Sequence, residues 1–380
     1  MVEIKISIPI GIGSVDVAQI NLPVEKIVGK LLRSNAEPIL AGNLVAWCFQ
    51  KVLDDQYTKG DAAGAWSRRY PEYIKFLYNG DIPSDVSWRE SITISAQIAA
   101  ALIQYSNKFP NENITKTISQ RLKLFKDYLK RHYSAELGGF GLATSGKYRG
   151  SPGISVDIRH TAWAVIALWH LGVQDSEIKE MFYSATRYIS SKIESDCRTI
   201  DKYALTYAAL HQILTTNKLS SVIMPSVQSC RSAQKRIEGI LIDKFVREYK
   251  SWDLDDLRDD PRVSIDNALS VLEPIQISSC IDSECSKVLK VALNHLYESL
   301  QPVGNKMMAL PFCEEGEPDI GATIELLWCI AKNQDVFKPK RNRVKKMINY
   351  IVDPLRQENN DKFAYPWNLS SALLLATKSQ

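Results

Sequence analysis

Two polar residues at the start of an apolar segment are the first candidates for chemistry. Arg159 and His160 directly precede the run Thr-Ala-Trp-Ala-Val-Ile-Ala-Leu-Trp of residues 161–169. A polar pair in such a segment costs free energy unless it is matched by a partner. We therefore expect both side chains to contact a ligand or partner. Asp157, just before them, is typical of an N-cap that satisfies free backbone N–H groups.

A glycine-rich segment precedes these residues. Residues 138–153 contain six glycines together with Lys147 and Arg149. The two basic side chains could bind an anion, and the glycines would allow the segment to act as a lid. The GxxxxGK[ST] spacing is absent, so a nucleotide P-loop is not indicated.

An acidic cluster forms the other candidate site. Asp253, Asp255, Asp256 and Asp259 lie within seven positions, and Pro261 follows closely. The proline favours a loop over a helix wall. Such a loop is most often simply solvated. Only the family resemblance described below implies a catalytic or metal-binding role for it.

Composition excludes several classes of function. The net charge is +4, so no strong polyanion field is expected, and we interpret the basic residues between 338 and 346 as a solvated helix face. Seven cysteines without paired spacing indicate a reducing compartment. No signal-peptide pattern and no sufficiently long apolar run is present. We therefore predict a cytoplasmic protein.

From about residue 36 the sequence alternates two kinds of helical segment. Apolar, small-residue segments begin near Asn43, Ser91, Asp157, Asp201, Asp266, Asp319 and Asn368. Amphipathic, charged segments lie between them, at 118–132, 178–192, 236–250, 287–300 and 341–351. The first kind should be buried and the second should lie outside. This repetition predicts an all-α fold, an α/α toroid of six or seven inner and outer helix pairs over residues 36–380.

Residues 1–23 differ from the rest of the chain. Val2, Ile4, Ile6, Ile8 and Ile10 alternate with mostly polar or small residues, and a glycine-containing turn follows. This pattern predicts a short β-hairpin appendage. A lone hairpin is marginal in water, so it should pack on the helical body or bind a protein partner.

The repeats resemble a known family. Gly138-Gly-Phe-Gly, followed by Val156-Asp-Ile-Arg-His-Thr-Ala-Trp-Ala-Val-Ile-Ala-Leu-Trp, resembles the repeats of squalene–hopene cyclases and protein prenyltransferase β subunits. The chain is similar to a divergent member of this terpenoid-cyclase and prenyltransferase superfamily. The resemblance implies a toroid with a central cavity for an isoprenoid, an isoprenoid diphosphate or another apolar ligand.

The resemblance also implies roles for particular residues. Terpenoid cyclases carry an Asp-x-Asp-Asp acid motif at an inner helix start, where this chain has Arg159 instead. The literal string occurs at Asp253, Asp255 and Asp256, which become candidate catalytic acids. Asp255, Asp256 and Asp259 also form a DDxxD string, which would hold Mg²⁺ and diphosphate. Asp266, Ser270 and Glu273 miss the spacing of a second metal motif by one residue.

The resemblance to prenyltransferase β subunits implies a different set of ligand-binding residues. There Asp157 and Arg159 would line the cavity, with Arg159 offering a cationic fork to a carboxylate or diphosphate. Prenyltransferases also need a zinc site with a late histidine, and all five histidines here precede residue 296. Zinc is therefore not expected.

Three classes of function remain open. The first is an isoprenoid-binding enzyme, a divergent terpene cyclase or prenyltransferase-like protein. The second is a catalytically inactive toroid that acts as a scaffold, whose centre should be filled by side chains. The third is a carbohydrate-active (α/α) barrel, which should hold a pair of carboxylates about 5–10 Å apart. No nucleic-acid partner is indicated.

Overall fold

The computed structural model describes residues 6–9, 14–17, 42–60, 62–66, 92–142, 155–172, 175–196, 199–214, 227–252, 264–278, 285–311, 316–333, 337–356 and 371–374. Everything below concerns these residues.

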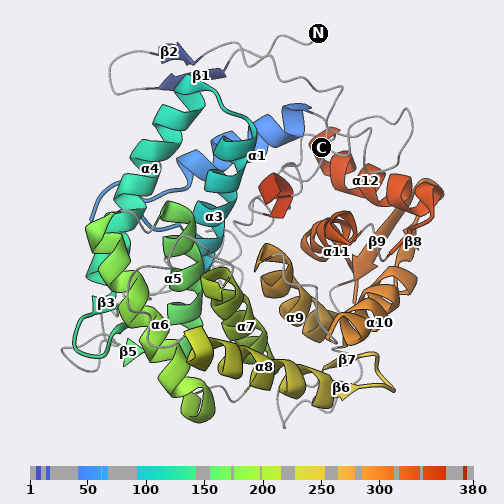
Figure 1. Cartoon of the computed structure of the whole chain (residues 1–380). Coiled ribbons are helices and arrows are strands. Elements are labelled where there is room, and N and C mark those ends of the chain that lie inside the picture. Colours follow the sequence, from blue (N-terminus) through green and yellow to red (C-terminus); the bar gives the residue numbers. More distant parts are fainter. Residues whose placement is uncertain are drawn as a thin grey trace, which may run out of the picture.

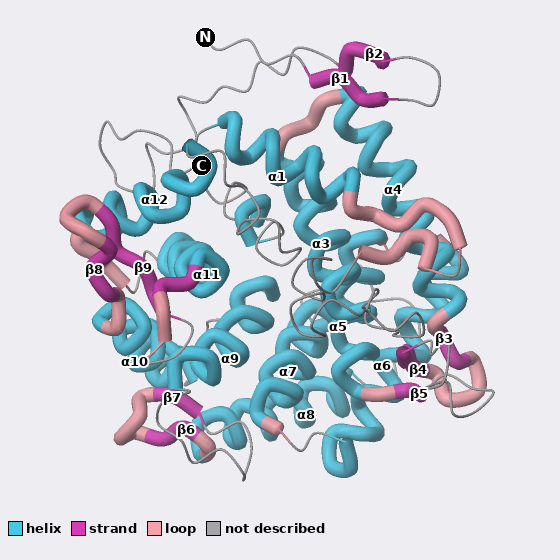
Figure 2. The backbone as a smooth tube through the Cα atoms, turned by 180° about the vertical axis from the view of Figure 1, so that it is seen from behind, coloured by secondary structure: helices cyan, strands magenta, loops and turns pink. Residues whose placement is uncertain are grey.

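Apolar helices form the inside of the molecule. They are α1 (Gly42–Asp54), α3 (Ile92–Lys108), α5 (Ile158–Leu171), α7 (Ile200–Leu214), α9 (Ser264–Ser278) and α11 (Ile320–Lys332). Every residue from Thr161 to Leu168 is buried, as expected for a helix that is apolar all round. From α3 onward, each packs on the next inner helix, up to α11 (Figures 1 and 2).

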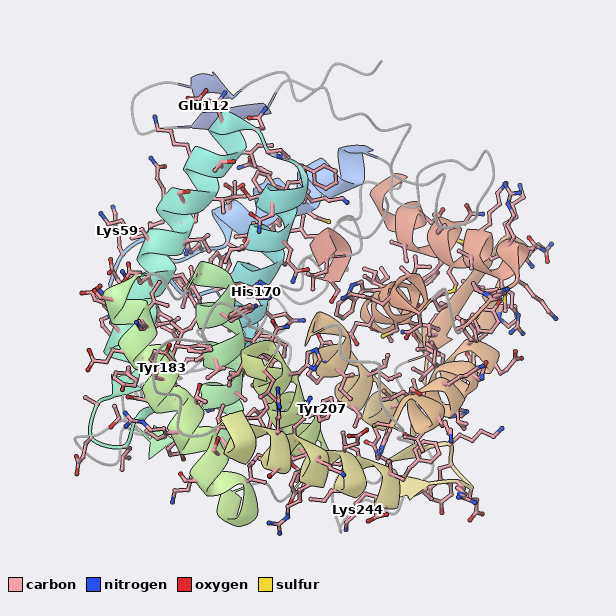
Figure 3. All side chains as sticks on the ribbon, in the orientation of Figure 1. Lys59, Glu112, His170, Tyr183, Tyr207 and Lys244 are labelled. Atoms are coloured by element: carbon pink, nitrogen blue, oxygen red, sulfur yellow. The ribbon has the colours of Figure 1, made fainter. Side chains whose placement is uncertain are left out.

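Amphipathic helices surround the inner ones. They are α4 (Glu112–Arg131), α6 (Ser176–Asp196), α8 (Val227–Asp243), α10 (Cys285–Glu298) and α12 (Arg341–Arg356). In α4, Ile114, Ile118, Phe125 and Leu129 form one buried stripe, while the charged residues lie on the other side. Figure 3 shows Lys59, Glu112 and Lys244 at the periphery. The predicted α/α toroid is therefore confirmed.

Small antiparallel sheets complete the fold. The N-terminal hairpin pairs β1 (Ile6–Pro9) with β2 (Ser14–Val17), as predicted. The others join an outer helix to the next inner helix: β3 (Tyr133–Ser134) with β4 (Gly139–Leu142) and β5 (Ser155–Val156), β6 (Phe245–Val246) with β7 (Ser251–Trp252), and β8 (Gln301–Val303) with β9 (Met307–Pro311) and β10 (Pro318–Asp319).

One of these sheets corrects a helix boundary. The segment 236–250 was expected to be helical throughout, but α8 ends at Asp243 and the chain turns into β6. Trp252 explains the difference, since its indole packs edge-on against Phe245 and its Nε1 donates to the carbonyl of Leu241 at 2.7 Å. The buried indole thereby stabilises the hairpin at the expense of two more helical turns.

The first turn of each of four inner helices is tied to the preceding segment. Ser95, Thr161 and Thr323 accept hydrogen bonds from the backbone N–H groups of Trp66, Phe140 and Leu310 at 2.9–3.0 Å. In α9 the contact is reversed, because Asn267 donates to the carbonyl of Trp252 at 2.9 Å. Each bond satisfies a buried backbone N–H or carbonyl group of the aromatic or leucine residue that precedes the helix. The junctions therefore hold the starts of the inner helices in register.

Glycine is required at one of these junctions. A Cβ at Gly139 would lie 2.5 Å from Cγ1 of Val156 and 3.1 Å from the Thr161 hydroxyl. Only a residue without a side chain lets β4 approach the start of α5 so closely. The Gly-Gly-Phe turn noted in the sequence thus places α5 and the polar residues at its start.

Within the described residues, no helix combines the length and apolarity needed to cross a membrane.

Candidate functional site

The start of α5 carries three of the predicted site residues. Asp157 is the N-cap, and its Oδ1 accepts the backbone N–H of His160 at 3.0 Å. Arg159 and His160 follow in the first turn, where β5 ends and the buried part of the helix begins. The structure therefore brings these residues together at one end of an inner helix.

Arg159 links α5 to α7 through an ion pair. One terminal guanidinium nitrogen lies 3.3 Å from Oδ2 of Asp201, and the two side chains are 48% and 15% exposed. The sequence places the start of an inner segment near Asp201, and α7 begins at Ile200, so that Asp201 lies inside the first turn. Its carboxylate is therefore directed to Arg159. An ion pair with one half-exposed partner is worth at most about 1 kcal/mol, so it adds little to stability.

The imidazole of His160 lies beside the carboxylate of Asp157. The two side chains approach to 3.0 Å between Nδ1 and Oδ1. Burial would raise the pKa of Asp157, but the contacts with His160 and the charge of Lys202 outweigh it and hold that pKa well below its ordinary value. Asp157 is therefore ionised throughout the neutral range and is not available as a proton donor.

A carboxyl group inside the ring forms the second part of the site. Glu273 lies in α9, and its Oε1 accepts a hydrogen bond from the side-chain amide of Gln97 in α3. Those two helices are separated along the inner row by α5 and α7. The bond therefore spans the ring from one side to the other. Pro274 follows Glu273 inside the helix and lacks the N–H that would bond the carbonyl of Ser270.

The environment of Glu273 favours its protonated form. Burial is the largest influence and raises its pKa to about 7, although the hydrogen bond from Gln97 and the charge of Arg159 act in the opposite direction. The side chain is half-buried, so it keeps some access to solvent. Among the described residues, its Oε2 has no hydrogen-bond partner. A carboxyl with a pKa near neutrality can give or accept a proton under physiological conditions.

A second carboxyl group lies in the neighbouring inner helix. Glu325 of α11 is half-buried, and Cys329 lies one turn further along the same helix. Burial raises the pKa of the Cys329 thiol, and the negative charges of Glu325 and Glu273 raise it further. Both carboxyl groups therefore lie within electrostatic reach of the same thiol.

Sequence reasoning noted Glu273 only as part of a failed metal motif and did not consider Glu325. A usable signal was present, because each residue is the only charged group in the middle of a helical segment that is mostly apolar. A carboxylate in that position is desolvated by the surrounding helices. Its pKa must then rise unless a cation lies beside it.

The remaining predicted residues lie outside the described part of the chain. Lys147 and Arg149 belong to the undescribed segment 143–154, and the aspartates at 253, 255, 256 and 259 belong to 253–263. Their catalytic, metal-binding or ligand-binding roles stay predictions. Within the described ranges, no group of three or more His, Cys, Asp or Glu side chains is arranged to hold a metal ion.

Comparison with known proteins identifies the architecture. No protein-family model matches the sequence, and no curated protein matches it either. Solved structures do match. A glucoamylase from Hypocrea jecorina has a TM-score of 0.57 at 11% identity, covering 89% of this chain and 72% of its own. An α-1,6-mannanase from Salegentibacter, in complex with α-1,6-mannotriose, has a TM-score of 0.55 at 14% identity, covering 88% and 98%.

A third match is a cellobiose 2-epimerase from Bacillus thermoamylovorans, with a TM-score of 0.51 at 12% identity, covering 83% of this chain and 87% of its own. All three names refer to carbohydrates. The interpretation as a terpenoid cyclase or prenyltransferase-like isoprenoid protein, which was our leading one, is therefore wrong.

That error has a physical cause. Asp caps, small-residue inner helices and aromatic turns serve the packing of helix pairs, so they occur wherever such pairs close into a ring. They cannot distinguish one toroid family from another. The chain is an α/α toroid, similar in fold to enzymes named for their action on carbohydrates.

Proposed function

We propose that this protein is a carbohydrate-active enzyme whose reaction depends on proton transfer at Glu273. The main observation behind this proposal is the half-buried carboxyl of Glu273. Its pKa is about 7, and it accepts a hydrogen bond from Gln97 across the inner ring. The matched folds of an epimerase, a glucoamylase and a mannanase support carbohydrate as the substrate class.

The chemistry assigned to Glu273 follows from its surroundings. At neutral pH both its protonated and ionised forms are populated, so it can protonate a sugar oxygen or remove a proton from a substrate. Gln97 holds one carboxyl oxygen, and no other described residue bonds the second, which could face a substrate. Glycoside hydrolysis further needs a second carboxylate, and Glu325 is the candidate within the described residues.

The test is a product assay on a panel of neutral and acidic oligosaccharides and polysaccharides. NMR of the products detects hydrolysis, elimination and epimerisation alike, so the reaction type need not be assumed. We expect Glu273→Gln to lower the rate by about 10²- to 10⁴-fold, the usual contribution of a general acid or base. Where Glu273 acts as the acid, the rate should also fall as the pH rises through about 7.

Glu180→Gln is the matched control, since Glu180 is an exposed residue of the outer helix α6. It should react like the wild type. Failure of the wild-type protein to transform or bind any carbohydrate would refute the proposal.

One observation favours the scaffold alternative. Because Gln97 and Glu273 meet across the ring, side chains fill its centre at that level. A non-catalytic toroid would bind no carbohydrate, and Glu273→Leu would stabilise it, because a half-buried acid would be replaced by an apolar side chain. The same panel therefore separates the two candidates.

We also propose a reducing compartment, the cytoplasm. The four cysteines among the described residues are free and buried. Binding of a protein partner by the N-terminal hairpin remains a further proposal.

A further inference from the structure

We infer that the guanidinium of Arg159 is the binding site for a carboxylate group on the substrate, which makes the substrate class an acidic sugar such as a uronate-containing oligosaccharide. This inference rests on the proposed function. It adds a recognition element that lies apart from the proton-transferring carboxyl.

The guanidinium has few partners among the residues that the structure describes. It is 48% exposed, and its ion pair with Asp201 occupies one terminal nitrogen at 3.3 Å. Within the described part of the chain, Arg159 makes no other hydrogen bond or ion pair. A guanidinium offers five N–H donors in a planar fork, so most of them remain available to a ligand.

The position of Arg159 relates it to Glu273. It lies in the first turn of α5, and its positive charge lowers the pKa of Glu273 in α9. Arg159 also pairs with Asp201 of α7, and α7 packs directly on α9, the helix that carries Glu273. The two groups are therefore close enough for one charge to influence the other. A sugar bound through its carboxylate to Arg159 could extend toward the Glu273 carboxyl.

The surrounding charges favour a carboxylate over a neutral group. Asp201 already shows that a carboxylate fits against this guanidinium, although at a single contact. The negative charge of Asp157 is offset in part by the positive charge of Lys202. A ligand carboxylate could thus make the two parallel bonds that Asp201 does not, and bidentate pairs of this kind are the stronger ones.

Calorimetric titration with an oligogalacturonate and with a neutral oligosaccharide of equal length tests the inference. We expect the acidic ligand to bind more tightly, and Arg159→Gln to weaken it by about tenfold or more, as the loss of a charge-assisted pair requires. Neutral-sugar binding should change by less than about twofold. Arg159→Lys should recover only part of the loss, because lysine keeps the charge but not the fork.

Asp201→Asn tests whether misfolding, rather than loss of the guanidinium, could explain weak binding by Arg159→Gln. It removes the competing carboxylate, so the acidic ligand should bind more tightly, a gain that an unfolded variant cannot show. Arg341→Gln, at an exposed position of α12, should behave as the wild type. Equal binding of acidic sugar by Arg159→Gln and the wild type would overturn the inference.

A wild-type preference for the neutral ligand would also overturn it and leave the proposed function standing. Failure to bind either sugar would refute both.

Discussion

The starts of α5 and α11 share one framework and differ where chemistry is expected. The first reads Asp157-Ile-Arg-His-Thr161 and the second Asp319-Ile-Gly-Ala-Thr323. In each, the aspartate is the N-cap, accepting the N–H three residues on at 3.0 and 2.7 Å. In each, the threonine hydroxyl donates to the carbonyl of the cap residue, at 2.7 and 2.6 Å. Arg159 and His160 are therefore additions to a framework that works without them.

The two caps have opposite electrostatics. Burial is the largest influence on both carboxyl groups, and it leaves the pKa of Asp319 above its ordinary value despite two backbone hydrogen bonds. At Asp157 the neighbouring His160 and Lys202 reverse the outcome and depress the pKa. The same helix-capping geometry thus produces a stable anion in α5 and a carboxyl that resists ionisation in α11. The difference lies in His160, which stands where α11 has Ala322, and in the charge of Lys202.

The largest expected effect comes from breaking the shared framework. Thr161→Val and Thr323→Val keep the side-chain volume but leave the N–H of Phe140 or Leu310 buried without an acceptor. Each should lower the free energy of unfolding by about 1–3 kcal/mol, the cost of an unsatisfied buried donor. Urea unfolding followed by tryptophan fluorescence measures the loss. Ser106→Ala is the control, because the Ser106 hydroxyl makes only an exposed contact with Thr115. It should change the free energy of unfolding little.

A clear difference between the two valine variants would show that the junctions are not equivalent. The comparison of α5 with α11 would then lose its common basis.

A smaller effect should separate the two caps. Asparagine caps a helix about as well as aspartate, so Asp157→Asn and Asp319→Asn remove the charge and keep the cap. At neutral pH, Asp157→Asn should lower the free energy of unfolding by roughly 0.5–1 kcal/mol. Asp319→Asn should leave it unchanged or raise it, because the ionised form of that buried carboxyl is unfavourable.

The pH dependence has opposite signs at the two positions. The folded-state pKa of Asp157 is depressed, so its contribution is present above the unfolded-state pKa of about 4 and is lost as the pH falls through the folded-state value. For Asp319 the folded-state pKa is raised, so stability is lost as the pH rises through that value. Urea unfolding at neutral and acidic pH gives both slopes. Equal slopes for the two variants would contradict the assigned electrostatics.

The sequence was sufficient for the architecture because hydrophobic periodicity and capping residues act locally. The apolar run after Asp157 and the buried stripe of α4 each determine which face of a helix is buried, without reference to the rest of the chain. The boundary at Asp243 was missed, because it depends on Trp252, which lies nine residues further along the chain and contacts the last turn of α8.

The candidate site could be predicted only in part, for a related reason. Arg159 and His160 are adjacent in the sequence and contrast with an apolar run, so their helix start was identified. Glu273 gains its properties from Gln97, 176 positions away, and from burial by several helices. No local sequence pattern indicates that Gln97 and Glu273 lie close together. Asp201, the partner of Arg159, was noted only as the start of an inner segment, because no local pattern shows that two helix starts lie side by side.

An effect of similar size tests whether Arg159 and His160 are separable from the framework. The double substitution Arg159→Gly with His160→Ala converts the α5 start into the Asp-Ile-Gly-Ala-Thr sequence of α11. Since α11 folds with that sequence, the protein should keep its fold and lose only about 1 kcal/mol, mostly from glycine in the first turn. The pKa of Glu273 should rise above about 7, because the lowering influence of the Arg159 charge is removed.

Carbon-13 NMR titration of the glutamate carboxyl groups, with Glu273→Gln to assign the resonance, measures this shift. Arg341→Gln removes a positive charge from the exposed start of α12 and should leave the resonance where it was. An unchanged Glu273 titration in the double variant would mean that Arg159 does not act on the interior carboxyl. The start of α5 and the centre of the ring would then be two independent sites.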